Sequence, residues 1–281
     1  MKLCFFGYDH SIDVLVRLME DGHEALQVYT FECDNFFSFN RETKLFCEKH
    51  HIPVIEGKIT PDDTEALLNK GCELFLSVGY PFKIPPIDEK RAYSVNIHPT
   101  LLPRARGIMP QPFIIYTEPE ASGFTIHKHT QEYDAGDILF QKAIPVEENT
   151  DIETLAARIA VHTPPAISMV LKDIEQYYAN AIPQDHSKAS YYDEPDAFFR
   201  TLQWSDTVEN LLHKGRAFGR FGVVAQISSK FGESQQLAVF QFSGWVEKHN
   251  LEPGTLVRSF PREITIAVQN GYICLKEFQN M

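Results

Sequence analysis

The sequence lacks the features that mark membrane proteins, disulfide-rich secreted proteins and zinc proteins. No stretch approaches the roughly 18 consecutive apolar residues of a membrane-spanning helix. The opening MKLCFFGYDH does not form the apolar region of a signal peptide. The five cysteines include no CxxC pair and no Cys/His spacing typical of zinc sites, so we expect reduced structural thiols. These absences predict a soluble cytoplasmic protein with no membrane segment and no metal ion.

Basic residues are also in short supply. The chain has 26 Lys and Arg against 38 Asp and Glu, which gives a formal net charge of −12. A polyanionic partner would have to bind a local basic cluster against this overall field, so broad nucleic-acid binding is disfavoured. With 281 residues, 43% of them hydrophobic, the chain is long enough for two compact domains.

Short apolar runs alternate with helical patterns in the first half of the chain. We expect strands at Leu3–Phe6, Ala25–Thr30, Leu74–Val78 and Ser94–Ile97, and helices at Ile12–Met19 and Arg41–Lys49. Strands separated by crossover helices indicate an α/β domain with a mostly parallel sheet. The last of these strands runs into a segment rich in Pro and Gly, at the sheet edge where open α/β sheets bind ligands.

The second half begins with a strand pair and a long helix and ends in a mostly β pattern. The pair is Phe124–His129 and Ile138–Ile144, and the helix runs from a capping box at 150–153 towards Tyr178, with Pro164 and Pro165 expected to kink or divide it. A polar segment, 183–190, follows. Beyond it we expect one helix, Asp206–Ala217, and strands at Val223–Ile227, Leu237–Phe242, Thr255–Val257, Ile264–Val268 and Ile273–Leu275. The pattern predicts a first domain at 1–182 and a second at 190–281.

Asn96 and His98 are the first candidates for catalysis. Residues i and i+2 of a strand point to one side, so the two side chains are presented together where the strand ends. An amide donor can stabilise a developing oxyanion. The imidazole can share that role or transfer protons instead. Asp134, from a distant Asp-Ala-Gly, could orient the imidazole or take a proton from an attacking amine. Taken singly, each motif is more often an ordinary turn than a catalytic site.

Two further histidines, His127 and His129, share one face of a predicted strand. Such a pair can bind a metal ion, but no carboxylate or cysteine is spaced to complete the site. We therefore favour a position for one of them along the substrate cleft.

The three motifs together resemble the folate-dependent formyltransferase family. The family signature is Asn-x-His, then Leu-Leu-Pro-x-x-Arg-Gly, then a later Asp-x-Gly; here these are Asn96 with His98, Leu101–Gly107, and Asp134–Gly136. The resemblance implies a Rossmann-like catalytic domain followed by a small OB-like β-barrel domain. It also implies N10-formyltetrahydrofolate as cofactor, formyl transfer to a primary amine, and Asn96, His98 and Asp134 as the catalytic residues.

The same resemblance places the pterin pocket along the strand at Leu74 and the loop that follows it. The implied cofactor contacts are Val78, Gly79, Tyr80 and Phe82, together with Asp137 and Ile138 after the catalytic aspartate. Each of the first four side chains is equally compatible with a buried strand and its turn.

The acceptor amine is predicted from charge. From residue 190 onward nine Lys and Arg stand against ten Asp and Glu, so a tRNA substrate is disfavoured. We therefore expect a nucleotide-linked amino sugar, of dTDP or UDP, as substrate. The candidate substrate-binding residues are Thr100, Arg104, Arg106 and Lys128, with Lys214 and Arg216 as further cations for a diphosphate; solvated cations are the alternative reading. Methionyl-tRNA formylation, formylation of an amino acid or hydroxylamine, and a folate-binding regulatory protein remain alternatives, and a homodimer is one open oligomeric state.

Overall fold

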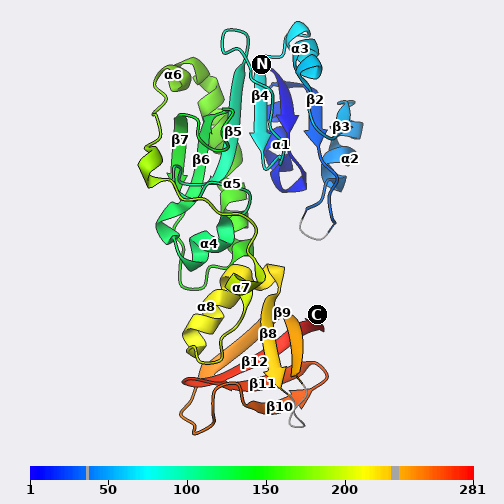
Figure 1. The fold of residues 1–281 in the computed structure, drawn as a ribbon. Helices are drawn as coiled ribbons and strands as arrows, with labels where there is room; N and C mark the ends of the chain where they lie inside the picture. Colours follow the sequence, from blue (N-terminus) through cyan, green and yellow to red (C-terminus); the bar gives the residue numbers. More distant parts are fainter. Residues whose placement is uncertain (36–37, 229–233) are drawn as a thin grey trace. The chain divides into compact units, whose positions relative to one another are not determined.

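Seven strands form one sheet in the computed structural model, which describes residues 1–35, 38–228 and 234–281. The strands are β1 (Lys2–Phe6), β2 (Glu24–Thr30), β3 (Val54–Glu56), β4 (Leu74–Val78), β5 (Tyr93–Thr100), β6 (Ser122–Lys128) and β7 (Ile138–Ala143). Their order is β3-β2-β1-β4-β5-β6-β7 (Figure 1). The first five are parallel, whereas β6 and β7 pair antiparallel at one edge. The predicted Rossmann-like sheet is confirmed.

The core of this sheet explains why its central strands are continuous apolar runs. Leu3, Cys4, Phe5 and Phe6 of β1 are all fully buried. Side chains of both faces are covered when crossover helices pack on a parallel sheet, so no polar alternation is needed. The ring of Phe6 stacks on Tyr29 of β2 with centroids 5.2 Å apart.

Helices α1 (Ile12–Glu20), α2 (Arg41–Lys49) and α3 (Pro61–Asn69) connect parallel strands of the sheet. Helices α5 (Ile152–Lys172) and α6 (Ile174–Ala179) follow β7 in the chain. Helix α3 begins in a capping box, since Thr60 Oγ1 accepts from the Asp63 N–H and the Asp63 carboxylate accepts from the Thr60 N–H. Pro61 occupies its first turn, where the missing N–H has no helical partner to lose.

The expected division at Pro164 and Pro165 is wrong in its position. Helix α5 runs unbroken through both prolines, and the break falls at Asp173, before α6. Buried Ile159, Ile167 and Val170 pack the helix on both sides of the prolines, which compensates the lost backbone bonds. The helix also starts after Asp151, whose carboxylate accepts from the Thr154 N–H, rather than in the expected box at Thr150.

The second half of the chain contains a five-stranded antiparallel sheet. Its strands are β8 (Val223–Ser228), β9 (Ser234–Val246), β10 (Leu256–Phe260), β11 (Glu263–Val268) and β12 (Gly271–Asn280), in the order β10-β11-β12-β9-β8. Helices α4 (Gln111–Tyr116), α7 (Ala197–Arg200) and α8 (Val208–Phe218) belong to the same part of the molecule. The curled sheet is an OB-like half-barrel, as predicted (Figure 1).

The chain folds into two compact units. Unit 1 consists of Met1–Pro110, Glu120–Pro145 and Ala156–Tyr191, and unit 2 of Gln111–Pro119, Val146–Leu155 and Tyr192–Met281. Short 3-10 helices are Asp9–Ser11, Pro119–Ala121, His186–Lys188 and Gly219–Phe221. All residues of the predicted catalytic set lie in unit 1.

Candidate active site

Strand β5 presents the first two catalytic candidates on one face of the sheet. Asn96 and His98 are two residues apart on this strand, and β6 places His127 opposite Asn96 and Thr125 opposite His98. Because paired residues of neighbouring strands point to the same side, these four polar side chains form a compact group. Three of them, His98, Thr125 and His127, are buried.

The third candidate, Asp134, comes from the loop between β6 and β7. Its Oδ1 lies 3.3 Å from His98 Nδ1 and 3.5 Å from Asn96 Nδ2. Its Oδ2 accepts a hydrogen bond from the Gly107 N–H at 3.0 Å. The structure therefore brings the three predicted catalytic side chains into contact.

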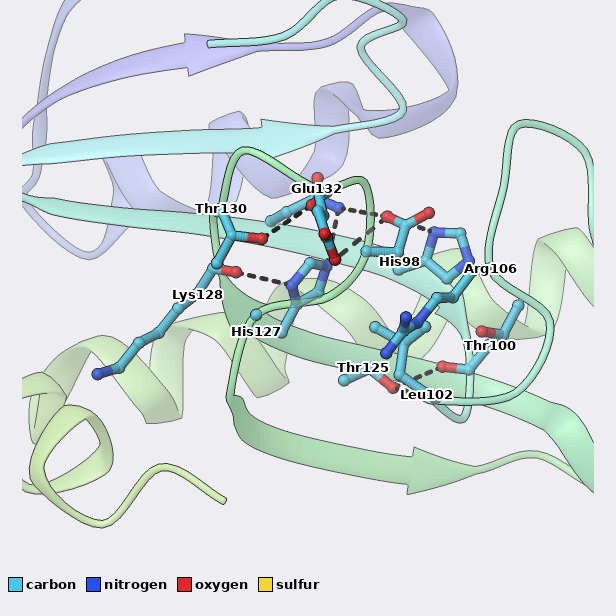
Figure 2. A network of polar contacts seen from close by, with 12 residues as sticks. His98, Thr100, Leu102, Arg106, Thr125, His127, Lys128, Thr130 and Glu132 are labelled. Atoms are coloured by element: carbon cyan, nitrogen blue, oxygen red, sulfur yellow. Dashed lines mark hydrogen bonds and ion pairs between the residues drawn. The ribbon is translucent and has the colours of Figure 1, made fainter. Parts of the chain in front are cut away.

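The β6–β7 loop reaches the sheet face through two unusual backbone positions. Asp134 has φ 54°, in the left-handed region that few residues other than glycine adopt. At Gly136 a Cβ atom would lie 1.9 Å from the Lys128 carbonyl oxygen, so only glycine allows this close approach. Figure 2 shows His127 and His98 with the loop residues Thr130 and Glu132 above them in this view.

His127 orients the amide of Asn96. The Lys128 carbonyl lies 2.8 Å from His127 Nδ1, so this nitrogen carries the proton. Nε2 is then the acceptor, and it receives a hydrogen bond from Asn96 Nδ2 at 3.0 Å. Burial lowers the pKa of His127 to about 3, against a smaller opposing effect of Asp134, so the ring stays neutral near neutral pH. Sequence reasoning assigned His127 to the cleft or to a metal site and missed this contact.

His98 has an oxygen acceptor at each ring nitrogen. Nε2 lies 2.9 Å from the Ala105 carbonyl, and Nδ1 faces the Asp134 carboxylate. A neutral imidazole can donate to only one of these oxygens, whereas an imidazolium donates to both. The ring is thus held in a place where a proton can pass between it and Asp134.

The loop after β5 is held by side chains of the neighbouring strands. Thr125 Oγ1 donates to the Thr100 carbonyl at 2.6 Å and accepts from the Leu102 N–H at 3.0 Å. Gln141 of β7 donates to the Leu102 carbonyl at 2.7 Å. The Leu102–Pro103 peptide bond is cis. Figure 2 shows Thr125 and Leu102 in this network.

The first four predicted cofactor residues lie beside β5, the strand of two catalytic candidates. Val78 ends β4 and pairs with Ile97, between the two catalytic candidates of β5. After it, Gly79 has φ 70°, and the rings of Tyr80 and Phe82 meet edge to face with centroids 5.3 Å apart. Tyr80 is buried and donates to the Gly57 carbonyl at 2.5 Å.

The other two cofactor candidates use their backbones in the β6–β7 region. The Asp137 carbonyl accepts from the Lys128 N–H at 2.9 Å, and Ile138 exchanges two backbone hydrogen bonds with Ile182. Both side chains are partly exposed. Contact of all six residues with a cofactor stays a prediction.

The predicted substrate residues are spread over different surroundings. Thr100 is buried and donates to the Arg104 carbonyl, while the exposed Arg104 guanidinium lies 3.5 Å from Glu120. Lys128 Nζ lies 3.6 Å from Glu89 and 4.6 Å from the centre of the Tyr178 ring. Arg106 is only 1% exposed. Their binding to a substrate stays a prediction.

The two further cations belong to unit 2. Lys214 Nζ donates to the Thr201 carbonyl at 2.9 Å, and burial lowers the pKa of Lys214. Arg216 Nη2 lies 3.4 Å from His213 Nδ1.

The structure also locates residues that sequence reasoning missed. Gln184 and Ser190 come from the polar segment that was expected to separate two domains. Gln184 Nε2 donates to the Asp134 carbonyl at 2.8 Å, and Ser190 Oγ accepts from the Ala105 N–H at 2.7 Å. No sequence signal points to these contacts, since they join residues 50 and 85 positions apart.

Among the residues outside 36–37 and 229–233, no three His, Cys, Asp or Glu side chains gather in a metal-binding group. The same residues contain no helix with the length and apolar character to cross a membrane.

Comparison with known families covers both units. A family model described as formyl transferase matches residues 55–171, and one described as formyl transferase, C-terminal domain, matches residues 198–281. The chain belongs to the formyl transferase family. The family predicted from the three motifs is thereby confirmed, and the chain is classed with enzymes that transfer formyl groups.

This formyltransferase is similar in sequence to one curated relative and in structure to two solved proteins. The chain is 25% identical to the methionyl-tRNA formyltransferase of Streptococcus sanguinis strain SK36, over 99% of this chain and 91% of the relative. HypX of Aquifex aeolicus, solved in complex with tetrahydrofolic acid, superposes with a TM-score of 0.71 at 19% identity, over 100% of this chain and 44% of HypX. This formyltransferase thus spans less than half the length of HypX.

The second solved structure is the N-formyltransferase of Helicobacter canadensis in complex with folinic acid and dTDP-3-aminofucose. It has a TM-score of 0.66 and 15% identity, with 99% of both chains covered. At these identities the two structural likenesses establish the shared fold.

Proposed function

We propose that this formyltransferase transfers the formyl group of N10-formyltetrahydrofolate to the primary amine of a nucleotide-linked amino sugar. The observation that carries the proposal is the meeting of the Asn96 amide, the His98 imidazole and the Asp134 carboxylate on one face of β5. An amide donor, an imidazole and a general base in contact are the groups that acyl transfer to an amine requires.

In this proposal the loop after β4 holds the flat, partly polar pterin ring. At Gly79 a Cβ atom would lie 2.8 Å from the Tyr8 ring, so this ring packs directly on the backbone of the loop. Next to it stand the Tyr80 and Phe82 rings. Val78, Gly79, Tyr80 and Phe82 would hold the pterin, and Asp137 with Ile138 would complete the pocket. When bound, the folate supplies an activated formyl group.

Asn96 supplies the N–H that stabilises negative charge on an oxygen. His127 fixes one of its two amide hydrogens, at 3.0 Å, while the contact of Nδ2 with Asp134 is long, at 3.5 Å. The second hydrogen is therefore weakly held by the protein and is available to a substrate oxygen. Losing an oxyanion donor of this kind costs about 100-fold to 1000-fold in rate.

Asp134 acts as the base for the incoming amine. Its Oδ2 is held by the Gly107 N–H, which leaves Oδ1 as the atom to take the proton. His98 Nδ1 lies 3.3 Å from Oδ1 and can receive or return that proton. The carboxyl group is mostly shielded from solvent, with a side-chain exposure of 10%, so bulk water competes little for the transfer.

Two observations favour an amino-sugar nucleotide as acceptor. The overall charge of −12 and the near balance of charge after residue 190 offer little attraction to tRNA. The Helicobacter canadensis enzyme, with the same fold over almost the whole chain, was solved with dTDP-3-aminofucose. Arg104 and Lys128 are the proposed direct substrate contacts. Thr100 and Arg106 are buried, so in this proposal they shape the substrate side of the site through the loop after β5.

Methionyl-tRNA formylation is the second candidate, favoured by the 25% identical relative from Streptococcus sanguinis. The purified full chain, given N10-formyltetrahydrofolate, should be tested against dTDP- and UDP-linked amino sugars, amino acids, hydroxylamines and charged initiator tRNA. Mass spectrometry of the acceptor reads out the product. Formylated amino sugar supports the proposal, formylated tRNA alone would replace it, and folate binding without product with any acceptor would favour a regulatory protein.

A further inference from the structure

The segment between α6 and unit 2 runs back along the active-site loops. At its start, Ile182 exchanges backbone hydrogen bonds with Ile138 at 2.8 and 2.9 Å. At its end, Ser190 accepts from the Ala105 N–H with its hydroxyl and from the Arg106 N–H with its carbonyl, at 2.7 and 2.8 Å. Residues between these two anchor points are thus held against the site.

Gln184 lies between the anchors, and its amide is fully used. It is 6% exposed. Its two Nε2 hydrogens can satisfy the Asp134 and Gly136 carbonyls, which lie at 2.8 and 2.7 Å. Its Oε1 accepts from Arg106 Nη2 at 2.5 Å. A buried amide with every hydrogen-bonding group engaged has one orientation, so it fixes whatever it contacts.

Arg106 links Gln184 to the loop that holds the Asp134 carboxylate. Its guanidinium is buried and donates to Gln184 and to the Tyr191 hydroxyl, the latter at 2.7 Å. The next residue, Gly107, gives its N–H to Asp134 Oδ2. The backbone of Asp134 is therefore held by Gln184 and its carboxylate by the residue after Arg106.

We propose that Gln184 is a positioning residue that acts through Asp134. Asp134 has a left-handed backbone, which an L residue rarely adopts unless its surroundings hold it there. The two side-chain N–H bonds of Gln184 hold the backbone here by donating to the carbonyls of residues 134 and 136. Because a base displaced by about 1 Å can cost about 100-fold in rate, the amide sets the reactivity of Asp134. The catalytic part of this inference rests on the proposed function.

Three variants separate positioning from general support. Gln184→Met removes the whole amide at similar length, and Gln184→Glu keeps an acceptor for Arg106 but has no N–H for the two carbonyls. Gln27→Met is the matched control, because Gln27 of β2 is also buried and donates to a backbone carbonyl, that of Pro53, and β2 is separated from β5 by β1 and β4. Both Gln184 variants should lower kcat about 10-fold to 100-fold, with the KM for the formyl donor within about 3-fold, and Gln27→Met should not.

A double-mutant cycle tests whether the effect passes through Asp134. In an Asp134→Asn background, Gln184→Met should lower the residual kcat by less than about 2-fold, since the group it positions is already lost. An equal fold loss in both backgrounds would show a general structural effect and overturn the inference. So would a Gln184→Glu protein with the kcat of the unchanged chain.

A second readout needs no activity. The Gly107 amide proton, measured by NMR on isotopically labelled protein, reports its bond to Asp134 Oδ2. Its resonance should move in both Gln184 variants, in the direction given by Asp134→Asn, and stay in place in Gln27→Met. An unmoved Gly107 resonance overturns the positioning role even if kcat falls. If the unchanged chain formylates no acceptor but the resonance moves as expected, the proposed function fails while the positioning of Asp134 stands.

Discussion

Acidification should weaken unit 1 through His127, because its buried ring takes up a proton only after unfolding. The folded pKa is lowered to about 3 from the ordinary 6.5. Below about pH 6.5 the unfolded chain binds more protons than the folded one, so the free energy of unfolding falls as pH falls. The full contribution is present above pH 6.5. Between about pH 7 and about pH 5, this single group should remove about 2 kcal/mol.

The measurement must report on unit 1. Both tryptophans, Trp204 and Trp245, belong to unit 2, so their fluorescence follows the wrong part of the chain. Cys47 is fully buried in unit 1, and its labelling by a thiol reagent along a urea gradient follows the right one. The free energy of unfolding of His127→Leu should change with pH by about 2 kcal/mol less than that of the unchanged chain. Equal pH dependence in the two proteins would refute the reasoning.

His129→Leu is the control that separates stability from catalysis. Burial also lowers the pKa of His129, to about 4, so its removal should flatten the pH dependence in the same way. Only His127→Leu removes the acceptor of the Asn96 amide. We expect His127→Leu to lower kcat at least about 10-fold. The loss should stay smaller than the loss of about 100-fold to 1000-fold expected when the donor Asn96 is itself removed. A similar loss in His129→Leu would contradict the role assigned to His127.

Three other substitutions test the site. Asn96→Ala should lose about 100-fold to 1000-fold in kcat while its thermal unfolding stays close to that of the unchanged chain; unimpaired turnover would remove Asn96 from the mechanism. Asp134→Asn should lose about 100-fold or more in kcat, and excess base in the buffer should not restore it. Gly136→Ala should lower the free energy of unfolding by about 3 kcal/mol in urea titrations, because its Cβ collides with the Lys128 carbonyl, and a fully stable variant would contradict that geometry.

The sequence was sufficient for most of the strands, because buried parallel strands are short apolar runs. Leu74–Val78 was predicted with its observed bounds, and Arg41–Lys49 likewise among the helices. Strand β3 was missed because it has three residues, none of them buried. Helix α3 was missed because few apolar residues mark its buried face.

In the candidate site, too, features set by local spacing could be predicted from the sequence, whereas contacts between distant residues could not. The spacing of Asn96 and His98 is a local pattern, so their common direction could be predicted. The pairing of Asn96 with His127 depends on the register of β5 against β6, which no local pattern specifies. Gln184 was missed because a polar stretch between two patterned regions is typical of a linker, and its contacts are set only by the folded chain.

The path of residues 182–191 bears on how this enzyme can be recombined with its relatives. Two-domain proteins are often divided at the polar stretch between patterned regions, which here falls after residue 182. A hybrid that kept only residues 1–182 would take Gln184 and Ser190 from the other parent, and with them the hydrogen bonds to Asp134 and Ala105. A junction after Tyr191 keeps both partners of these hydrogen bonds from this chain.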